Sequence, residues 1–121
     1  MNGTVDQQNR ALIDVVVRRA KGASETTVTA WIDTAFDGHL VFPRRLIEEL
    51  DLEPLVQTEA ILADGKKVTL ETFVCYLNWF GTTTVLQVIE NEGRLPLLGT
   101  GLLDNHVLHI DYAAKRLTLD Q

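Results

Sequence analysis

The first residues that could carry chemistry stand at the end of an apolar run. Asp33 and Thr34 follow Trp31-Ile32 in the stretch Trp-Ile-Asp-Thr-Ala-Phe-Asp-Gly. A carboxylate beside a buried strand is costly unless it is paired, hydrogen-bonded or useful. Such a group acts as a general base or acid on a bound water when a reaction needs one. The plainer alternative is a loop carboxylate that accepts local N–H bonds, which Asp-Thr does well at turns.

A second corner of similar design lies 64 residues further on, at Leu97-Leu98-Gly99-Thr100-Gly101-Leu102-Leu103. It has two apolar residues, a glycine and then a predicted short helix. The spacing Gly99-x-Gly101 also suits a phosphate loop, but the third glycine of a dinucleotide fingerprint is missing and no parallel βαβ pattern surrounds it. Phosphate binding is therefore disfavoured.

Short strands must position these two corners. Alternating apolar residues and turn signals at close spacing predict an all-β barrel or sandwich with one or two short helices. Asp64-Gly65 accepts the positive φ angles of a tight type I′ hairpin between two of the strands. The expected strands are 11–18, 26–32, 38–42, 56–63, 66–79, 82–90, 107–112 and 116–120, residues 95–98 lead into a Gly-rich corner, and the expected helices are 44–50 and 102–106.

Composition limits the classes of function. The chain has 121 residues, 45% of them hydrophobic, which fits one domain, and we expect it at 11–121 after a disordered N-terminal tail at 1–10. The net charge of −6, without a cluster of Lys or Arg, argues against nucleic-acid and membrane partners. The single cysteine excludes an intrachain disulfide and, with no secretory or membrane-spanning pattern, indicates a cytoplasmic protein.

Together the two corners resemble the retropepsin-like aspartic proteases of the pepsin clan, in particular the small bacterial members with an Asp-Thr-Gly-Phe-like signature. Leu62-Ala63-Asp64-Gly65 stands where that family has its flap hairpin, and His109-Ile110-Asp111 opens the final hairpin. The resemblance covers roughly residues 30–119 and implies a closed, barrel-like, all-β fold. It implies catalytic roles for Asp33, Thr34 and Ala35, substrate contacts for Asp37, Gly38, Ala63, Asp64 and Gly65, and a supporting position beneath the site for Leu97, Leu98 and Gly99.

The activity that the resemblance implies is hydrolysis of peptide bonds by a pair of Asp carboxyls and a shared water. One carboxylate acts as general base while the protonated carboxyl polarises the scissile carbonyl. No second Asp in this chain is followed by Ser or Thr and a small residue, so the pair requires a homodimer that brings together one Asp33 from each subunit. The expected partners are a peptide or protein substrate and a second copy, and no metal or other cofactor is expected.

Two departures from the family pattern define the rival hypotheses. Ala35 replaces the family's glycine, which keeps the backbone N–H but adds a Cβ and narrows the allowed φ angles. Thr100 stands where retroviral members commonly carry an Arg that helps to tie the dimer together. The alternative function is therefore a catalytically inactive dimer of the same fold that binds a peptide or protein. A monomeric β-barrel with an unrelated small-molecule site is a third possibility.

Several other residues have competing interpretations. Asp37 either meets the substrate backbone or forms an Asp-Gly turn, and His39 is predicted to be a solvated strand residue rather than a substrate contact. His106 and His109 have a spacing that suits a metal on a helix, but His109 falls in a strand-like run. Cys75 is predicted to be a small buried hydrophobe rather than a nucleophile, and Trp31 and Trp79 to be core or interface residues.

Overall fold

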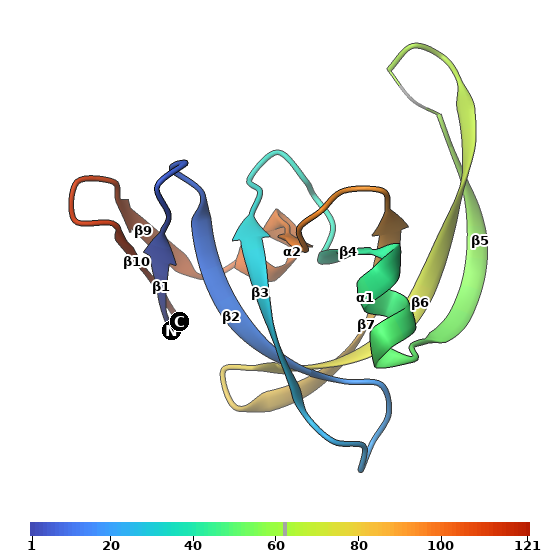
Figure 1. Cartoon of the computed structure of the whole chain (residues 1–121), viewed down its shortest axis with the longest axis horizontal. Coiled ribbons are helices and arrows are strands. Elements are labelled where there is room, and N and C mark those ends of the chain that lie inside the picture. The colour runs from blue at the N-terminus through green and yellow to red at the C-terminus, as the bar shows by residue number, and fades with distance from the viewer. Residues whose placement is uncertain (62) are drawn as a thin grey trace.

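The computed structural model describes residues 1–61 and 63–121 of the chain. Within them the polypeptide forms a mainly β structure with two short helices (Figure 1). In chain order the elements are β1 (Asn2–Val5), β2 (Ala11–Arg18), β3 (Thr26–Ile32), β4 (Leu40–Pro43), α1 (Arg44–Leu50), β5 (Glu53–Ile61), β6 (Lys67–Trp79), β7 (Thr82–Asn91), β8 (Leu97–Leu98), α2 (Thr100–Leu103), β9 (Val107–Asp111) and β10 (Arg116–Asp120).

Alternation of side chains explains the strands that carry the first corner. In β2 every second residue from Ala11 to Val17 is buried, and in β3 the buried residues are Val28, Ala30 and Ile32. Because successive side chains of a strand point to opposite faces, each of these strands turns one face to the core and the other to solvent. The predicted range 26–32 coincides with β3.

A closed ring of strands forms the body of the protein. The sheet order is β5-β6-β7-β4-β8-β3-β2-β1-β10-β9, and an additional antiparallel pairing of β2 with β6, from Val16↔Asn78 to Arg18↔Tyr76, joins β2 back to β6. The fully buried side chains include Leu40, Phe42, Leu77, Val88 and Leu98, which come from the strands of this ring. The predicted closed, barrel-like, all-β fold is confirmed.

The first helix forms as predicted and the second is displaced. α1 spans Arg44–Leu50, buries Ile47 and ends at Asp51, whose φ of 54° is left-handed. α2 begins at Thr100, two residues before the predicted range 102–106, because distant carbonyls rather than local signals satisfy its first N–H groups. No helix among the described residues is long and apolar enough to cross a membrane.

The prediction of a disordered tail at residues 1–10 is wrong. Residues 2–5 form β1, which pairs with β10 through Asn2↔Thr118 and with β2 through Val5↔Ala11. The N-terminal ammonium of Met1 donates to the Leu119 carbonyl at 2.7 Å, so the two ends of the chain lie side by side (Figure 1). The segment shows no apolar alternation because its order comes from backbone pairing with residues more than 100 positions away.

Candidate active site

Asp33 stands directly after the last residue of β3, at the edge of the core. The backbone N–H of Asp33 donates to the Leu98 carbonyl at 2.9 Å, which continues the parallel pairing of β3 with β8. The side chain is half-buried, and its Oδ1 accepts the N–H of Ala35 at 3.0 Å. This local hydrogen bond, together with partial exposure to solvent, offsets the desolvation free energy of a carboxylate next to an apolar strand.

The second corner lies directly beneath the first. β8 is inserted between β3 and β4, with Ile32↔Leu98 paired in parallel and Leu40↔Leu98 antiparallel. Below the loop at 33–39, the N–H of Gly99 donates to the His39 carbonyl at 2.9 Å. Leu97, Leu98 and Gly99 therefore lie against the loop that carries Asp33.

The start of α2 binds the same loop from below. The N–H of Thr100 donates to the Phe36 carbonyl at 2.8 Å, and its hydroxyl donates to the same oxygen at 3.2 Å. The N–H of Gly101 donates to the Gly38 carbonyl at 3.0 Å. Thr100, which cannot form the family's ion pair, instead ties the Asp33 loop to the helix.

An open pocket of about 380 Å³ surrounds the Asp33 carboxyl. Five of its residues come from the first corner and one from the second, and the lining consists of Trp31, Ile32, Asp33, Thr34, Ala35 and Leu97. Trp31, predicted as a core or interface residue, is 38% exposed and forms one wall of this pocket. The chemistry available is one carboxyl group beside an apolar wall.

Two residues at the rim were not found by sequence reasoning. The guanidinium of Arg10 lies 5.8 Å from the centre of the Trp31 ring, a cation–π distance, and its Nε donates to Oδ2 of Asp6 at 2.7 Å. The backbone N–H of Arg10 is the main cause that holds the pKa of Asp6 below its ordinary value. The sequence has no pattern that predicts the contact of Arg10 and its partner Asp6 with Trp31. The register of β2 against β3, in which Leu12 pairs with Trp31, brings these residues together.

The hairpin of β5 and β6 carries the predicted flap residues at its tip. The two strands pair from Glu53↔Val74 to Ile61↔Lys67, and the hairpin projects from the ring (Figure 1). Gly65 has a φ of 85°, whereas Asp64 has no positive φ, so the tip is not the predicted type I′ turn. Oδ1 of Asp64 instead accepts the N–H of Lys66 at 3.0 Å. Leu62 lies outside the described residues, and Ala63, Asp64 and Gly65 are not among those that line the Asp33 pocket.

Asp37 and Gly38, predicted to contact substrate, also lie outside that lining. Asp37 is exposed and borders a separate shallow hollow together with Thr100 and Gly101. Gly38 is half-buried, and the ring of Phe36 occupies the place that a side chain at Gly38 would need. Both residues remain predicted contacts of a substrate that would extend beyond the pocket.

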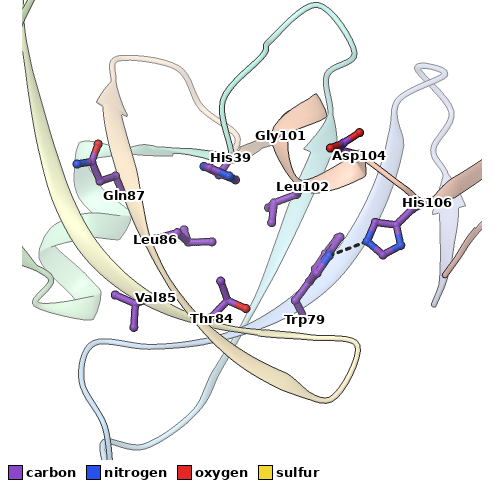
Figure 2. A pocket seen from close by; sticks show the side chains of 10 residues that line it. All are labelled: His39, Trp79, Thr84, Val85, Leu86, Gln87, Gly101, Leu102, Asp104 and His106. Carbon is purple, nitrogen blue, oxygen red and sulfur yellow. Dashed lines mark hydrogen bonds between the residues drawn. The ribbon is translucent and has the colours of Figure 1, made fainter.

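A second pocket, of about 400 Å³, lies apart from Asp33 and shares no residue with its pocket (Figure 2). One lining residue is His39, which is exposed, as predicted, although it lies just before β4 rather than within a strand. Another is His106, whose Nε2 accepts the indole N–H of Trp79 at 3.2 Å. The ring of Phe80 stacks on His106 with centroids 4.6 Å apart. Within the described residues, His, Cys, Asp and Glu side chains do not gather in groups of three or more that could hold a metal.

Cys75 is fully buried in β6, and burial raises the pKa of its thiol from 9.0 to about 12. Because the thiolate is the reactive form, this environment makes the residue inert at neutral pH. The predicted interpretation as a small buried hydrophobe agrees with this position.

Solved structures resemble this chain over nearly its whole length. A retropepsin-like aspartic protease from Rickettsia conorii matches with a TM-score of 0.64 and 15% identity, covering 99% of this chain and 89% of that chain. EIAV protease, solved with an inhibitor, matches with a TM-score of 0.59 and 15% identity, over 84% of this chain and 92% of that one. This chain has the retropepsin-like fold.

A more distant protein shows the same retropepsin-like fold. The retroviral protease-like domain of Ddi1 from Leishmania major matches with a TM-score of 0.50 and 18% identity, over 91% of this chain and 89% of that one. No protein-family model matches the chain, and no curated protein is significantly similar to it in sequence. The resemblance seen in the sequence is therefore confirmed at the level of the fold.

Proposed function

We propose that this chain is an aspartic endopeptidase that works as a homodimer. The observation that carries the proposal is the Asp33 carboxyl, which is held by the N–H of Ala35 at the wall of an open pocket, on a loop that β8 and α2 support from below. The retropepsin-like fold and the aspartic proteases that share it give this carboxyl its proposed role.

The chemistry requires a second carboxyl group, and among the residues that the structure describes Asp33 is the only ionisable one lining its pocket. We infer that a second copy of the chain supplies the partner Asp33 across a two-fold axis, which makes the interface isologous. Two carboxyls that share one site do not readily ionise together, so one is ionised and the other keeps its proton.

In the proposed reaction the ionised carboxyl removes a proton from a bound water, and the water oxygen attacks the carbon of the scissile carbonyl. The protonated carboxyl donates its proton to the carbonyl oxygen, giving a neutral tetrahedral diol. Collapse of the diol breaks the C–N bond: the ionised carboxyl takes a proton from one diol hydroxyl while the protonated carboxyl donates its proton to the leaving nitrogen. The products are an amine and a carboxylic acid, and the pair again holds one proton. The substrate is an extended peptide, because such clefts bind peptides through backbone hydrogen bonds.

The test is cleavage of a proteome-derived peptide library from about pH 3.5 to 7.5, a range that brackets the ordinary carboxyl value and its usual upward shifts. The expected result is a set of cuts that Asp33→Asn reduces by about a hundredfold or more, as removal of a general base does. Specific activity should fall on dilution, because monomers carry half a site. A folded dimer that shows no Asp33-dependent cuts, but binds peptides, would instead be the inactive binding module.

A further inference from the structure

One edge of β7 is open beside the second pocket. β7 pairs with β6 along its length, from Thr82 to Ile89. On its other side β7 pairs with β4 only from Leu40↔Val88 to Pro43↔Asn91. In the described part of the chain, no strand neighbours residues 82–87 on that side.

The hairpin that joins β6 to β7 determines which backbone groups of this edge are free. Its turn places Phe80 and Gly81 at φ values of 51° and 82°, with Trp79↔Thr82 as the closing pair. Hydrogen bonding alternates along an antiparallel pair, so the backbone groups of Thr83 and Val85 and the N–H of Gln87 point away from β6, beyond the segment that β4 pairs. Unpaired groups of this kind are a template for another strand.

The second pocket lies against this edge, where an extension of β4 before Leu40 would run. Four consecutive β7 residues, 84–87, line it, as expected when the edge of a strand faces a cavity. Leu86 of β7 and Leu102 of α2 extend into the pocket from opposite sides, and both are largely buried (Figure 2). His39, just before β4, closes the end nearest the sheet.

The polar groups of the pocket indicate the charge of an occupant. Asp104 is exposed, and among the described residues it is the only Asp, Glu, Lys or Arg that lines this pocket. No ion pair or hydrogen bond of the described residues engages its carboxylate. The chain as a whole has a net charge of −6. A cationic group is therefore complementary to this pocket.

We propose that an extended segment of a partner protein binds here as an added strand along β7. Its backbone pairs with Val85 and Gln87, an aliphatic side chain enters between Leu86 and Leu102, and a Lys or Arg faces Asp104. The aliphatic and basic residues lie on one face of the added strand, so their positions in the peptide differ by two or four. This surface is separate from the Asp33 pocket and does not depend on the activity proposed for it.

The experiment uses the full chain with Asp33→Asn, so that cleavage does not consume the probe, and a positional-scanning library of blocked hexapeptides. The expected binders combine a Lys or Arg with an aliphatic residue two or four positions away, and they shift the amide NMR signals of Val85 and Gln87. Val85→Pro removes one outward N–H without touching the β6 ladder, as edge strands tolerate, and should weaken binding about fivefold. Val85→Thr keeps the N–H and is the matched control, with affinity unchanged.

Two further measurements do not depend on how Val85→Pro folds. Two versions of the best peptide are compared, one N-methylated at its odd-numbered amides and one at its even-numbered amides. Only the version whose methylated amides face β7 should bind more weakly, and the other should keep its affinity. Asp104→Asn should weaken a Lys-containing peptide by about twofold to fivefold and leave its norleucine counterpart unchanged. Equal loss in both methylated versions, no effect of Asp104→Asn, or shifts confined to Thr34 and Ala35 would overturn the proposal, as would a library without binders.

Discussion

Gly99 lies against the backbone of Phe36 and leaves no room for a side chain. A Cβ at Gly99 would come within 2.6 Å of the Phe36 carbonyl oxygen, and still closer to that of Gly38. Its φ of −99° is open to any residue, so space rather than backbone conformation requires the glycine. This close approach lets the N–H groups of Gly99 and Thr100 reach the loop that carries Asp33.

Gly99→Ala should therefore destabilise the protein severely. Two of the three nearest atoms are the backbone carbonyl oxygens of Gly38 and Phe36, which cannot rotate aside as a side chain can, so we expect a loss of about 1–3 kcal/mol in the free energy of unfolding. Urea denaturation followed by circular dichroism measures it. Gly93→Ala is the matched control, since its Cβ would meet the movable side chain of Asn91 at 3.2 Å, and should change stability by less than about 0.5 kcal/mol. Equal losses in both variants would contradict the steric explanation.

Ala35 is not strained by its Cβ. It is not among the non-glycine residues with positive φ, and its N–H still reaches Asp33. Ala35→Gly should therefore leave the proposed peptide cleavage unchanged and lower stability by about 0.4–1 kcal/mol, because glycine gives the unfolded chain more freedom. Unfolding midpoints and cleavage rates of wild type and Ala35→Gly, measured together, show whether the Cβ of Ala35 strains the loop. A variant that is both faster and more stable would show that Ala35 strains the loop.

Cys75 predicts a loss of stability at alkaline pH. Burial raises the pKa of its thiol in the folded protein from 9.0 to about 12, so between these values the unfolded chain loses the proton and the folded chain keeps it. The favourable contribution is complete below pH 9 and decreases as the pH rises. The difference in unfolding free energy between the wild type and Cys75→Val should narrow over this range. A thiol reagent at pH 8 should label only the unfolded protein, and rapid labelling of the native protein would contradict the burial.

Trp31 should set the preference for residues beside the scissile bond, if the proposed proteolysis holds. Its exposed ring forms an apolar wall of the Asp33 pocket, so Trp31→Ala should lower kcat/KM for large apolar side chains by about tenfold. Small side chains should be affected less. Trp79→Phe is the control, because Trp79 lies in the other pocket and its loss should leave the preference unchanged. An equal loss for all substrates would indicate a structural rather than a selective role.

Asp6 should contribute to stability only while it is ionised. Hydrogen bonds from Arg10 lower the pKa of Asp6 in the folded state. Because the pKa of Asp6 is lower in the folded state, its ionised carboxylate stabilises the fold at pH values above the ordinary pKa of 3.8. This contribution is lost as the pH falls through the pKa of Asp6 in the folded protein. Thermal unfolding of wild type and Asp6→Asn should therefore differ at pH 6 and converge near pH 2. A constant difference across that range would contradict the assignment.

The sequence by itself determined the local elements and the main candidate. Alternation marked β3 at 26–32, a helical pattern marked α1 at 44–50, and the polar break after Ile32 marked Asp33. These signals are local, because side-chain period and turn chemistry depend on residues a few positions apart. Two short motifs in the expected order were enough to indicate the fold.

Only the tertiary structure decided how distant segments meet. β1 is ordered by pairing with β10, Arg10 reaches Trp31 through the register of β2 and β3, and α2 begins where the Asp33 loop accepts its N–H groups. The open edge of β7 likewise arises because β4 begins only at Leu40, which pairs with Val88. These features depend on backbone pairing between residues far apart in sequence, and such pairing carries no side-chain pattern of its own.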